Sequence, residues 1–185
     1  MDDLSQWDVL LRVLVAGGLG AIIGLERERT RRAAGVRTHT LVAVGSALLT
    51  ASTILFMSEN GGSAGEAIRM AAGIVTGVGF IGAGTIIVAE GRVRGLTTAA
   101  TVWVTAGVGI TAGLGYLLLA ALVAGPVTVT ILLLGIAEKR LEQARVDQAR
   151  AGENGAGRGR AGQEAGGWDE GDGRDEGDEG RGGEP

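Results

Sequence analysis

Cysteine is absent from this 185-residue chain, and histidine occurs once, at His39. Without cysteine there is no disulfide framework, no thiolate metal site and no cysteine nucleophile. A single histidine also excludes a metal centre built from several imidazoles. Aromatic residues make up only 3% of the chain. We therefore expect no catalytic, metal or cofactor site of these kinds.

Charged residues are absent from three long stretches of the chain, residues 40–58, 70–89 and 95–137. A helix needs about 20 apolar residues to cross the hydrocarbon core of a bilayer. The first two stretches fit one helix each and the third fits two, while residues 9–25 contain only Arg12 as a charge. The sequence therefore predicts an all-α, polytopic membrane helix bundle with spans at about 9–25, 40–58, 70–89, 95–113 and 116–136.

The basic residues of the connecting segments predict the orientation of these spans. The segment after the first span has five arginines, the segment after the third has two, and Lys139, Arg140 and Arg145 follow the fifth. Positive charge collects on the cytoplasmic side of membrane proteins. We therefore expect the N-terminus outside and the C-terminus in the cytoplasm.

The chain divides by composition into three parts. Residues 1–137 form the predicted transmembrane domain, and residues 138–150 the juxtamembrane end of the last helix. Residues 151–185 carry ten acidic residues against four arginines and are rich in glycine. Such a composition cannot bury enough apolar area to fold, so we expect this acidic tail to be disordered. No nucleic-acid partner is expected.

The stretch GVGFIGAG, residues 77–84, spells the G-x-G-x-x-G of dinucleotide-binding turns. That motif needs a preceding strand and an acid about 20 residues later, and residues 97–105 contain no acid. Two interpretations remain open. Small residues let membrane helices pack closely within one protomer or an oligomer, or they allow a bent or unwound helix whose carbonyls line a polar path. The candidate residues are Gly77, Gly79, Phe80, Gly82 and Gly84.

Pairs of glycines four residues apart favour the packing interpretation. They occur at Gly20 and Gly24, at Gly73 and Gly77, and at Gly109 and Gly113. Each pair places two glycines on one face of a helix.

Residues 24–40 have the densest charge outside the tail. The arginines suit a topology anchor at the lipid headgroups. Glu26 and Glu28 do not contribute to anchoring, so an ion-pair network with a binding role is the alternative. In that alternative Glu26, at the end of the first span, pairs with Arg37, just before the second. The candidate interaction residues are Glu26, Arg27, Arg37, Thr38 and His39.

Two further groups of polar residues lie at the ends of spans. Glu66 and Arg69 are three residues apart, on one helix face, and Glu66 suits a helix N-terminus; a cap with a local salt bridge is expected. Thr97 and Thr98 begin the fourth span, where their hydroxyls can bond to the backbone or to another helix. Trp103 lies about two turns into that span, so we expect it to pack between helices.

The stretches GGLGAIIGLERE (17–28), AGVRTHTLVAVGSAL (34–48), RMAAGIVTGVGFIGAG (69–84) and GLTTAATVWVTAGVGITAGLGY (95–116) together resemble the MgtC/SapB family of bacterial inner-membrane proteins. The family's Asp before the third span is replaced here by Glu66, and a Gln that often follows is replaced by Gly73. The resemblance implies a domain of four to five membrane helices, and the chain is similar to the short members that lack a folded cytoplasmic domain.

The resemblance also implies a function and a location. Family members are associated with magnesium limitation and acid or host stress, and are thought to act by modulating other membrane proteins. We therefore expect a non-enzymatic protein of the bacterial inner membrane, with the bilayer and other membrane proteins as partners and a capacity for homo-oligomer formation. The alternative is an oligomeric carrier of small solutes or ions that uses the glycine-rich third span.

Overall fold

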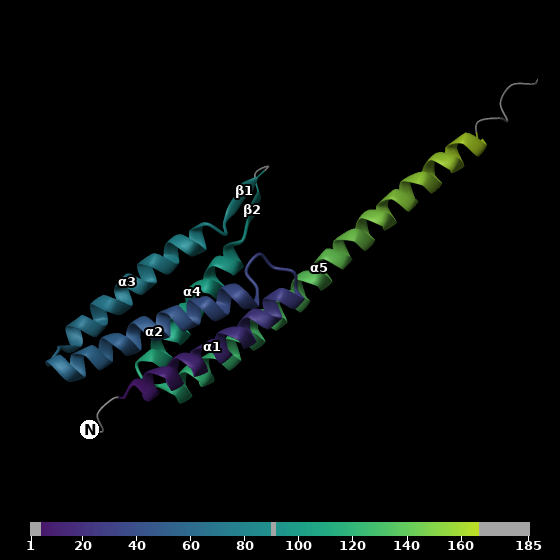
Figure 1. Ribbon diagram of the computed structural model, residues 1–185. Coiled ribbons are helices and arrows are strands. Elements are labelled where there is room, and N and C mark those ends of the chain that lie inside the picture. The colour runs from purple at the N-terminus through teal and green to yellow at the C-terminus, as the bar shows by residue number, and fades with distance from the viewer. Residues whose placement is uncertain (1–4, 90–91, 167–185) are drawn as a thin grey trace, which may run out of the picture. The chain divides into compact units, whose positions relative to one another are not determined.

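The computed structural model describes residues 5–89 and 92–166 of the chain. Five helices run in order: α1 (Gln6–Arg29), α2 (Val36–Asn60), α3 (Ala64–Ala83), α4 (Leu96–Gly113) and α5 (Leu117–Gly166). Each contains a segment long and apolar enough to cross a membrane. Consecutive helices return along the bundle, so that α1, α3 and α5 run against α2 and α4 (Figure 1). The predicted all-α, five-span bundle is confirmed.

The helix ends follow local chemistry. Ser5 caps α1 and Ser63 caps α3, each in a reciprocal capping box that satisfies backbone N–H groups at the helix start. α2 ends at Gly61, which adopts a left-handed φ of 75° that glycine reaches without a Cβ penalty. The first three helices begin before the predicted spans do. A capped helix end is stable outside the hydrocarbon, so its residues need not belong to an apolar run of membrane length.

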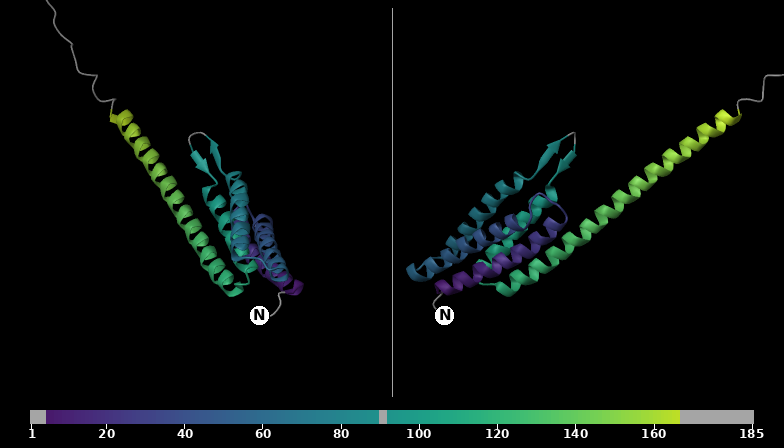
Figure 2. Two further views of the ribbon diagram at one scale, coloured as in Figure 1. Left: turned by 90° about the vertical axis from the view of Figure 1, so that its left-hand side faces the viewer. Right: turned by 45° about the vertical axis from the view of Figure 1, so that its right-hand side comes forward.

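A short hairpin, β1 (Ile87–Ala89) and β2 (Arg92–Arg94), connects α3 to α4. Its strands pair antiparallel, with Val88 opposite Val93, and it projects beyond the ends of α3 and α4 that it connects (Figure 2). The prediction that the third span continues to residue 89 is therefore wrong. The run of β-branched residues from Thr85 to Val88 favours extended backbone, which a count of uncharged residues does not register.

Two hydrophobic cores hold the helices of residues 1–136 together. The first joins α1, α2, α4 and the first part of α5, mainly through buried alanines such as Ala16, Ala43 and Ala120. The second joins α3 to α4 around Ile74, Val78 and Val102. Half of the apolar window of α4 is buried, against 11% of that of α3. α4 is therefore the central helix and α3 is covered least by the rest of the chain.

Of the second unit of the chain, the structure describes residues 137–166. α5 continues through residues 151–166, which the composition predicted to be disordered. Once a helix has started, each further residue adds a hydrogen bond without a new nucleation cost. The Ala, Glu, Gln and Arg of this segment are good helix formers, and the glycines between them oppose the helix. Residues 167–185, the rest of the predicted disordered tail, lie outside the described residues.

Candidate functional site

α1 and α2 cross at very short range, and two glycines of α1 make this crossing possible. A Cβ atom placed on Gly20 would lie 2.7 Å from the carbonyl oxygen of His39. One placed on Gly24 would lie 2.6 Å from the Cα atom of Val36. These neighbours are backbone atoms and cannot rotate away. The expected close packing at this glycine pair is confirmed.

α4 crosses α2 in the same manner. A Cβ atom on Gly109 would lie 2.5 Å from the carbonyl oxygen of Ala43, and one on Gly113 would lie 2.8 Å from that of Ala47. Small residues allow this backbone approach, which supplies the van der Waals contacts that hold membrane helices together. α1, α2 and α4 are thus the tightly packed part of the bundle.

The glycines of α3 are different. A Cβ atom on Gly73, Gly77 or Gly79 would meet no atom within 4 Å, and one on Gly82 would make ordinary contact with Ala99 at 3.5 Å. The expected close packing of Gly73 and Gly77 against another helix is therefore not found among the described residues of this chain. Packing of the same face against another molecule stays a prediction.

α3 is also an unbroken helix through Ala83, and Gly84 is only its C-cap. The hydroxyl of Thr85 donates to the carbonyl oxygen of Gly82 at 2.7 Å, which satisfies one of the free carbonyls at this end. The unwound third span that the carrier interpretation requires is not present. Phe80 projects outward and is 83% exposed.

A cavity of about 440 Å³ lies between α3 and α4, and we call it the α3–α4 groove. Its floor consists of small side chains, and the indole of Trp103 forms part of its wall. Trp103 is half exposed, so the expectation that it packs between helices is wrong within this chain. The lining residues are Val78, Gly79, Gly82, Ala83, Ile86, Ala99, Ala100, Trp103 and Val104.

Buried polar residues gather at the end of the bundle that carries the arginine-rich loop, which we call the basic end. Glu26, Arg27 and His39 are all nearly inaccessible. The Arg27 guanidinium lies 3.7 Å from the Glu26 carboxylate. Arg37, the partner expected for Glu26, is exposed instead. The expected Glu26–Arg37 pair is therefore wrong: the ion pair of Glu26 is with the adjacent Arg27.

His39 lies in the first turns of α2, where its Nδ1 is 2.9 Å from the carbonyl oxygen of Gly35. A carbonyl only accepts, so Nδ1 carries the proton and Nε2 presents a lone pair. This Nε2 is buried and has no hydrogen-bond partner among the described residues. Next to it in the sequence, Thr38 is only partly buried.

Glu28 has a role that the sequence did not reveal. Its Oε2 accepts the backbone N–H of Val36 at 2.9 Å, and Gly35, the N-cap of α2, has no side chain to do so. A carboxylate is favourable at a helix N-terminus, because it satisfies a free N–H and opposes the positive end of the helix dipole. Glu28 therefore caps α2 from the preceding helix.

The threonines of α4 bond along their own helix. The hydroxyl of Thr101 donates to the carbonyl oxygen of Thr97, and that of Thr105 to the carbonyl oxygen of Thr101 at 2.8 Å. Thr98 is buried and Thr97 is exposed. The structure thus shows bonding to the backbone at Thr101 and Thr105, and the alternatives for the hydroxyls of Thr97 and Thr98 stay predictions.

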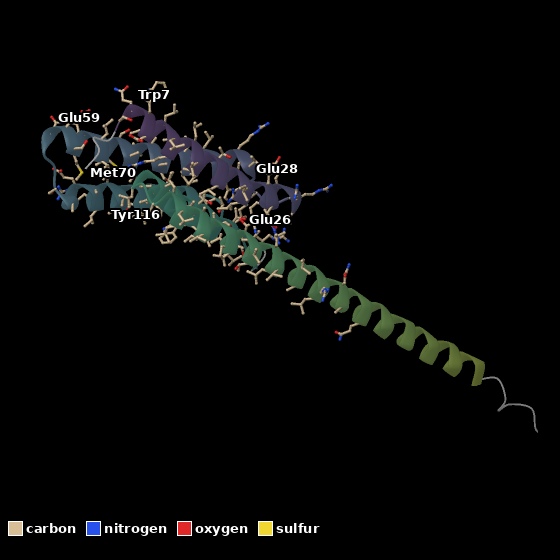
Figure 3. The ribbon with its side chains drawn as sticks, turned by 90° about the horizontal axis from the view of Figure 1, so that it is seen from below. Trp7, Glu26, Glu28, Glu59, Met70 and Tyr116 are labelled. Carbon is tan, nitrogen blue, oxygen red and sulfur yellow. The ribbon has the colours of Figure 1, made fainter. Side chains whose placement is uncertain are left out.

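Figure 3 shows Glu26 and Glu28 at the basic end, far from Trp7 and Glu59 at the opposite end. At that opposite end Glu66 accepts the backbone N–H of Ser63 at 2.9 Å, so the expected cap is confirmed. Arg69 makes no ion pair with Glu66 within the described residues, so the expected salt bridge is not found.

Arg12, also near the opposite end, is a second residue whose role the sequence did not reveal. Its Nη1 donates to the carbonyl oxygen of Gly113 at 2.9 Å. A cation suits the negative end of a helix dipole, so Arg12 fixes the C-terminus of α4. An arginine inside an apolar span is the signal that could have drawn attention to it.

Eight of the predicted residues thus fall into three separate places. Glu26, Arg27 and His39 come together at the basic end, and Gly79, Gly82 and Trp103 share the α3–α4 groove. Glu66 and Arg69 lie at the opposite end. Within the described residues, no three His, Asp or Glu side chains converge in a way that could hold a metal ion.

These features define a multi-pass membrane protein whose tightly packed helices leave one helix open. The model of the MgtC family matches residues 13–140, and the chain belongs to this family. It is 44% identical to Protein MgtC of Salmonella typhimurium over 112 residues, which cover 60% of this chain and 46% of that protein. Protein SrpB of Synechococcus elongatus is 44% identical over 124 residues, covering 60% of this chain and 68% of that protein.

A third relative is the Escherichia coli protein named putative magnesium transporter YhiD, 40% identical over 114 residues that cover 58% of this chain and 52% of that protein. The chain spans about half the length of the MgtC and YhiD relatives that it matches. No solved structure matches the chain.

Proposed function

We propose that this chain is a non-enzymatic protein of the bacterial cytoplasmic membrane that modulates partner membrane complexes when magnesium is limiting or under acid or host stress. Membership of the MgtC family supports this proposal, as does the name of one relative as a putative magnesium transporter. The arginines at the basic end support a cytoplasmic location for that end, because positive charge collects on the cytoplasmic side of membrane proteins.

The observation that carries the proposal is the exposure of α3 beside the α3–α4 groove. Lipid tails give no hydrophobic drive for association, so a partner helix must gain its contacts from close packing. The groove offers a floor of glycine and alanine for such an approach, and Trp103 at its wall is half exposed. Tryptophan is the residue type that most often contributes large binding energies at interfaces.

A carrier needs a different architecture. Carriers commonly bind their substrate at discontinuous helices near the bilayer midplane, whereas α3 is continuous from Ala64 to Ala83. A buried carboxylate is present, Glu26, but it lies at the basic end and is paired with Arg27. These observations favour modulation of partners over transport.

The absence of cysteine allows a direct test by single-cysteine crosslinking in native membranes. Gly79→Cys places a thiol in the α3–α4 groove, and Gly18→Cys places one on α1, where a Cβ atom also meets nothing. Gly79→Cys should crosslink to a defined membrane protein that mass spectrometry identifies, and Gly18→Cys should not.

The identified partner then provides the functional readout. Its activity should change when the wild-type chain is added to proteoliposomes, and Gly79→Leu, which fills the groove, should abolish the change. Equal crosslinking from both positions, or a partner whose activity does not respond to the chain, would contradict the proposal.

A further inference from the structure

The other side of α3 carries a second hollow, between α2 and α3, whose lining shares only Val78 with that of the α3–α4 groove. Two cavities of about 630 and 440 Å³ adjoin there and share Leu49, Met70 and Gly73 in their linings. Together they form one continuous hollow along the two helices, which we call the α2–α3 groove. It reaches from Glu66 at the opposite end to Ile81 near the basic end.

The walls of this groove are apolar and face outward. Leu41, Leu49 and Phe56 line it and are between 51% and 69% exposed. Its floor contains Gly45, Gly73 and Gly77, where an added Cβ atom would meet nothing within 4 Å. The space is therefore not filled by this chain. A cleft of this size with apolar walls suits a single small amphiphile.

The wide mouth of the groove has a carboxylate and a guanidinium, one helical turn apart. Glu66 and Arg69 both line the larger cavity. Glu66 uses Oε2 to accept the Ser63 N–H, and Arg69 has no ion-pair or hydrogen-bond partner within the described residues. Opposite charges that do not pair with each other present a bipolar site to whatever enters the groove.

The two charged side chains at the mouth favour a ligand that carries both a phosphate and an ammonium group. Arginine matches the oxygens of a phosphate with parallel N–H donors, and a carboxylate accepts hydrogen bonds from a primary ammonium group. A phospholipid headgroup of the ethanolamine type carries both groups a few bonds apart. A choline headgroup has no N–H to donate, and an anionic glycerol headgroup has no cation for Glu66.

We propose that the α2–α3 groove binds one phosphatidylethanolamine molecule. Its phosphate contacts Arg69, its ammonium group contacts Glu66, and one acyl chain lies along Gly73 and Gly77. The proposal uses a different face of α3 from the partner site, so either can fail without the other.

Native mass spectrometry of the purified full-length chain in detergent tests the proposal with three probes: phosphatidylethanolamine, phosphatidylcholine and phosphatidylglycerol of identical acyl chains. The ethanolamine lipid should bind about tenfold more tightly than either of the others, the difference expected for one charged hydrogen-bonded contact. Equal binding of all three, or a preference for the glycerol lipid, would overturn the assignment.

Variants separate the head and tail contacts. Glu66→Gln keeps a capping side chain at this position and should remove the preference for ethanolamine over choline. Arg69→Gln should weaken both of these lipids about equally, and Gly73→Leu should block the acyl chain. Gly18→Leu, at an open glycine on α1, is the matched control and should bind the lipid as the wild type does. Unchanged binding in Gly73→Leu would overturn the proposal.

A measurement on the wild-type chain covers the case in which a variant does not fold. Phosphatidylethanolamine with a photoactivatable acyl chain should label peptides within residues 41–57 and 66–81. Labelling spread evenly over all five helices would contradict a defined site. A chain dimer that Gly73→Leu dissociates would show that a second copy, and not a lipid, fills the groove.

Discussion

Substitution of Gly109 by alanine is the sharpest test of how the bundle is held together. The added methyl carbon would lie 2.5 Å from the carbonyl oxygen of Ala43 and 2.8 Å from the Cβ atom of Ser46. Ordinary contact begins at 3.4 Å, so α4 and α2 would have to separate by about 0.9 Å, the difference between 3.4 and 2.5 Å. Neither neighbour can avoid the clash by rotating a side chain.

The size of the effect follows from two opposing terms. Forcing an extra carbon into a well-packed site costs about 1–3 kcal/mol. Alanine in place of glycine stabilises a helix by up to about 1 kcal/mol. Gly109→Ala should therefore lower the free energy of unfolding by up to about 2 kcal/mol. Gly77→Ala, which meets no atom within 4 Å, should leave it unchanged or raise it by up to about 1 kcal/mol.

The assay is equilibrium unfolding in mixed micelles with increasing SDS, followed by tryptophan fluorescence. The two variants differ from the wild type by the same single methyl group, so each serves as the control for the other. If Gly109→Ala and Gly77→Ala unfold at the same SDS fraction, the distinction between a closed and an open glycine pair is wrong.

Three further substitutions test individual contacts, with the same unfolding assay. Glu28→Ala should cost about 0.5–2 kcal/mol because it removes the cap of α2, and Glu28→Gln should retain most of the stability; equal losses would refute the cap. Gly115 has a φ of 95°, so Gly115→Ala should cost about 1–2 kcal/mol. The methyl group would also crowd the Arg12 guanidinium at 3.0 Å, and an unchanged midpoint would contradict this. Exchange of the charges of Glu26 and Arg37 should not recover the stability lost by reversing Glu26 alone, because the two residues do not pair. Full recovery would show that they do pair and would contradict the structure.

The spans were predictable because hydrocarbon imposes a strong length requirement. Uncharged runs of the right length indicate membrane helices almost regardless of detail, and all five are present. The end of α3 was not predictable in this way. Residues 84–89 are as uncharged as the helix before them, and charge counting cannot distinguish a helix from the strand that follows it.

The glycine pairs show that a sequence motif does not predict which glycines pack against a neighbouring helix. Gly20 with Gly24, Gly73 with Gly77 and Gly109 with Gly113 have identical spacing, yet two pairs are closed and one is open. Spacing places both glycines on one face, but the rotation of the helix in the bundle decides what that face meets. That rotation depends on the packing of all neighbouring helices.

The charged contacts were missed for a related reason. Glu28 reaches the start of α2 and Arg12 reaches the end of α4, and the second contact joins residues 101 apart in the sequence. Only the fold brings a helix end next to such a side chain. The Glu66 cap was predictable, because a capping box is local.

We propose that this chain acts on other membrane proteins and does not itself move ions. Purified protein in proteoliposomes loaded with a fluorescent magnesium indicator tests it directly, with an imposed Mg²⁺ gradient and with protein-free vesicles as the baseline. The Mg²⁺ flux should be indistinguishable from that baseline. A saturable flux that rises with the amount of protein and is lost in Gly79→Leu would contradict it.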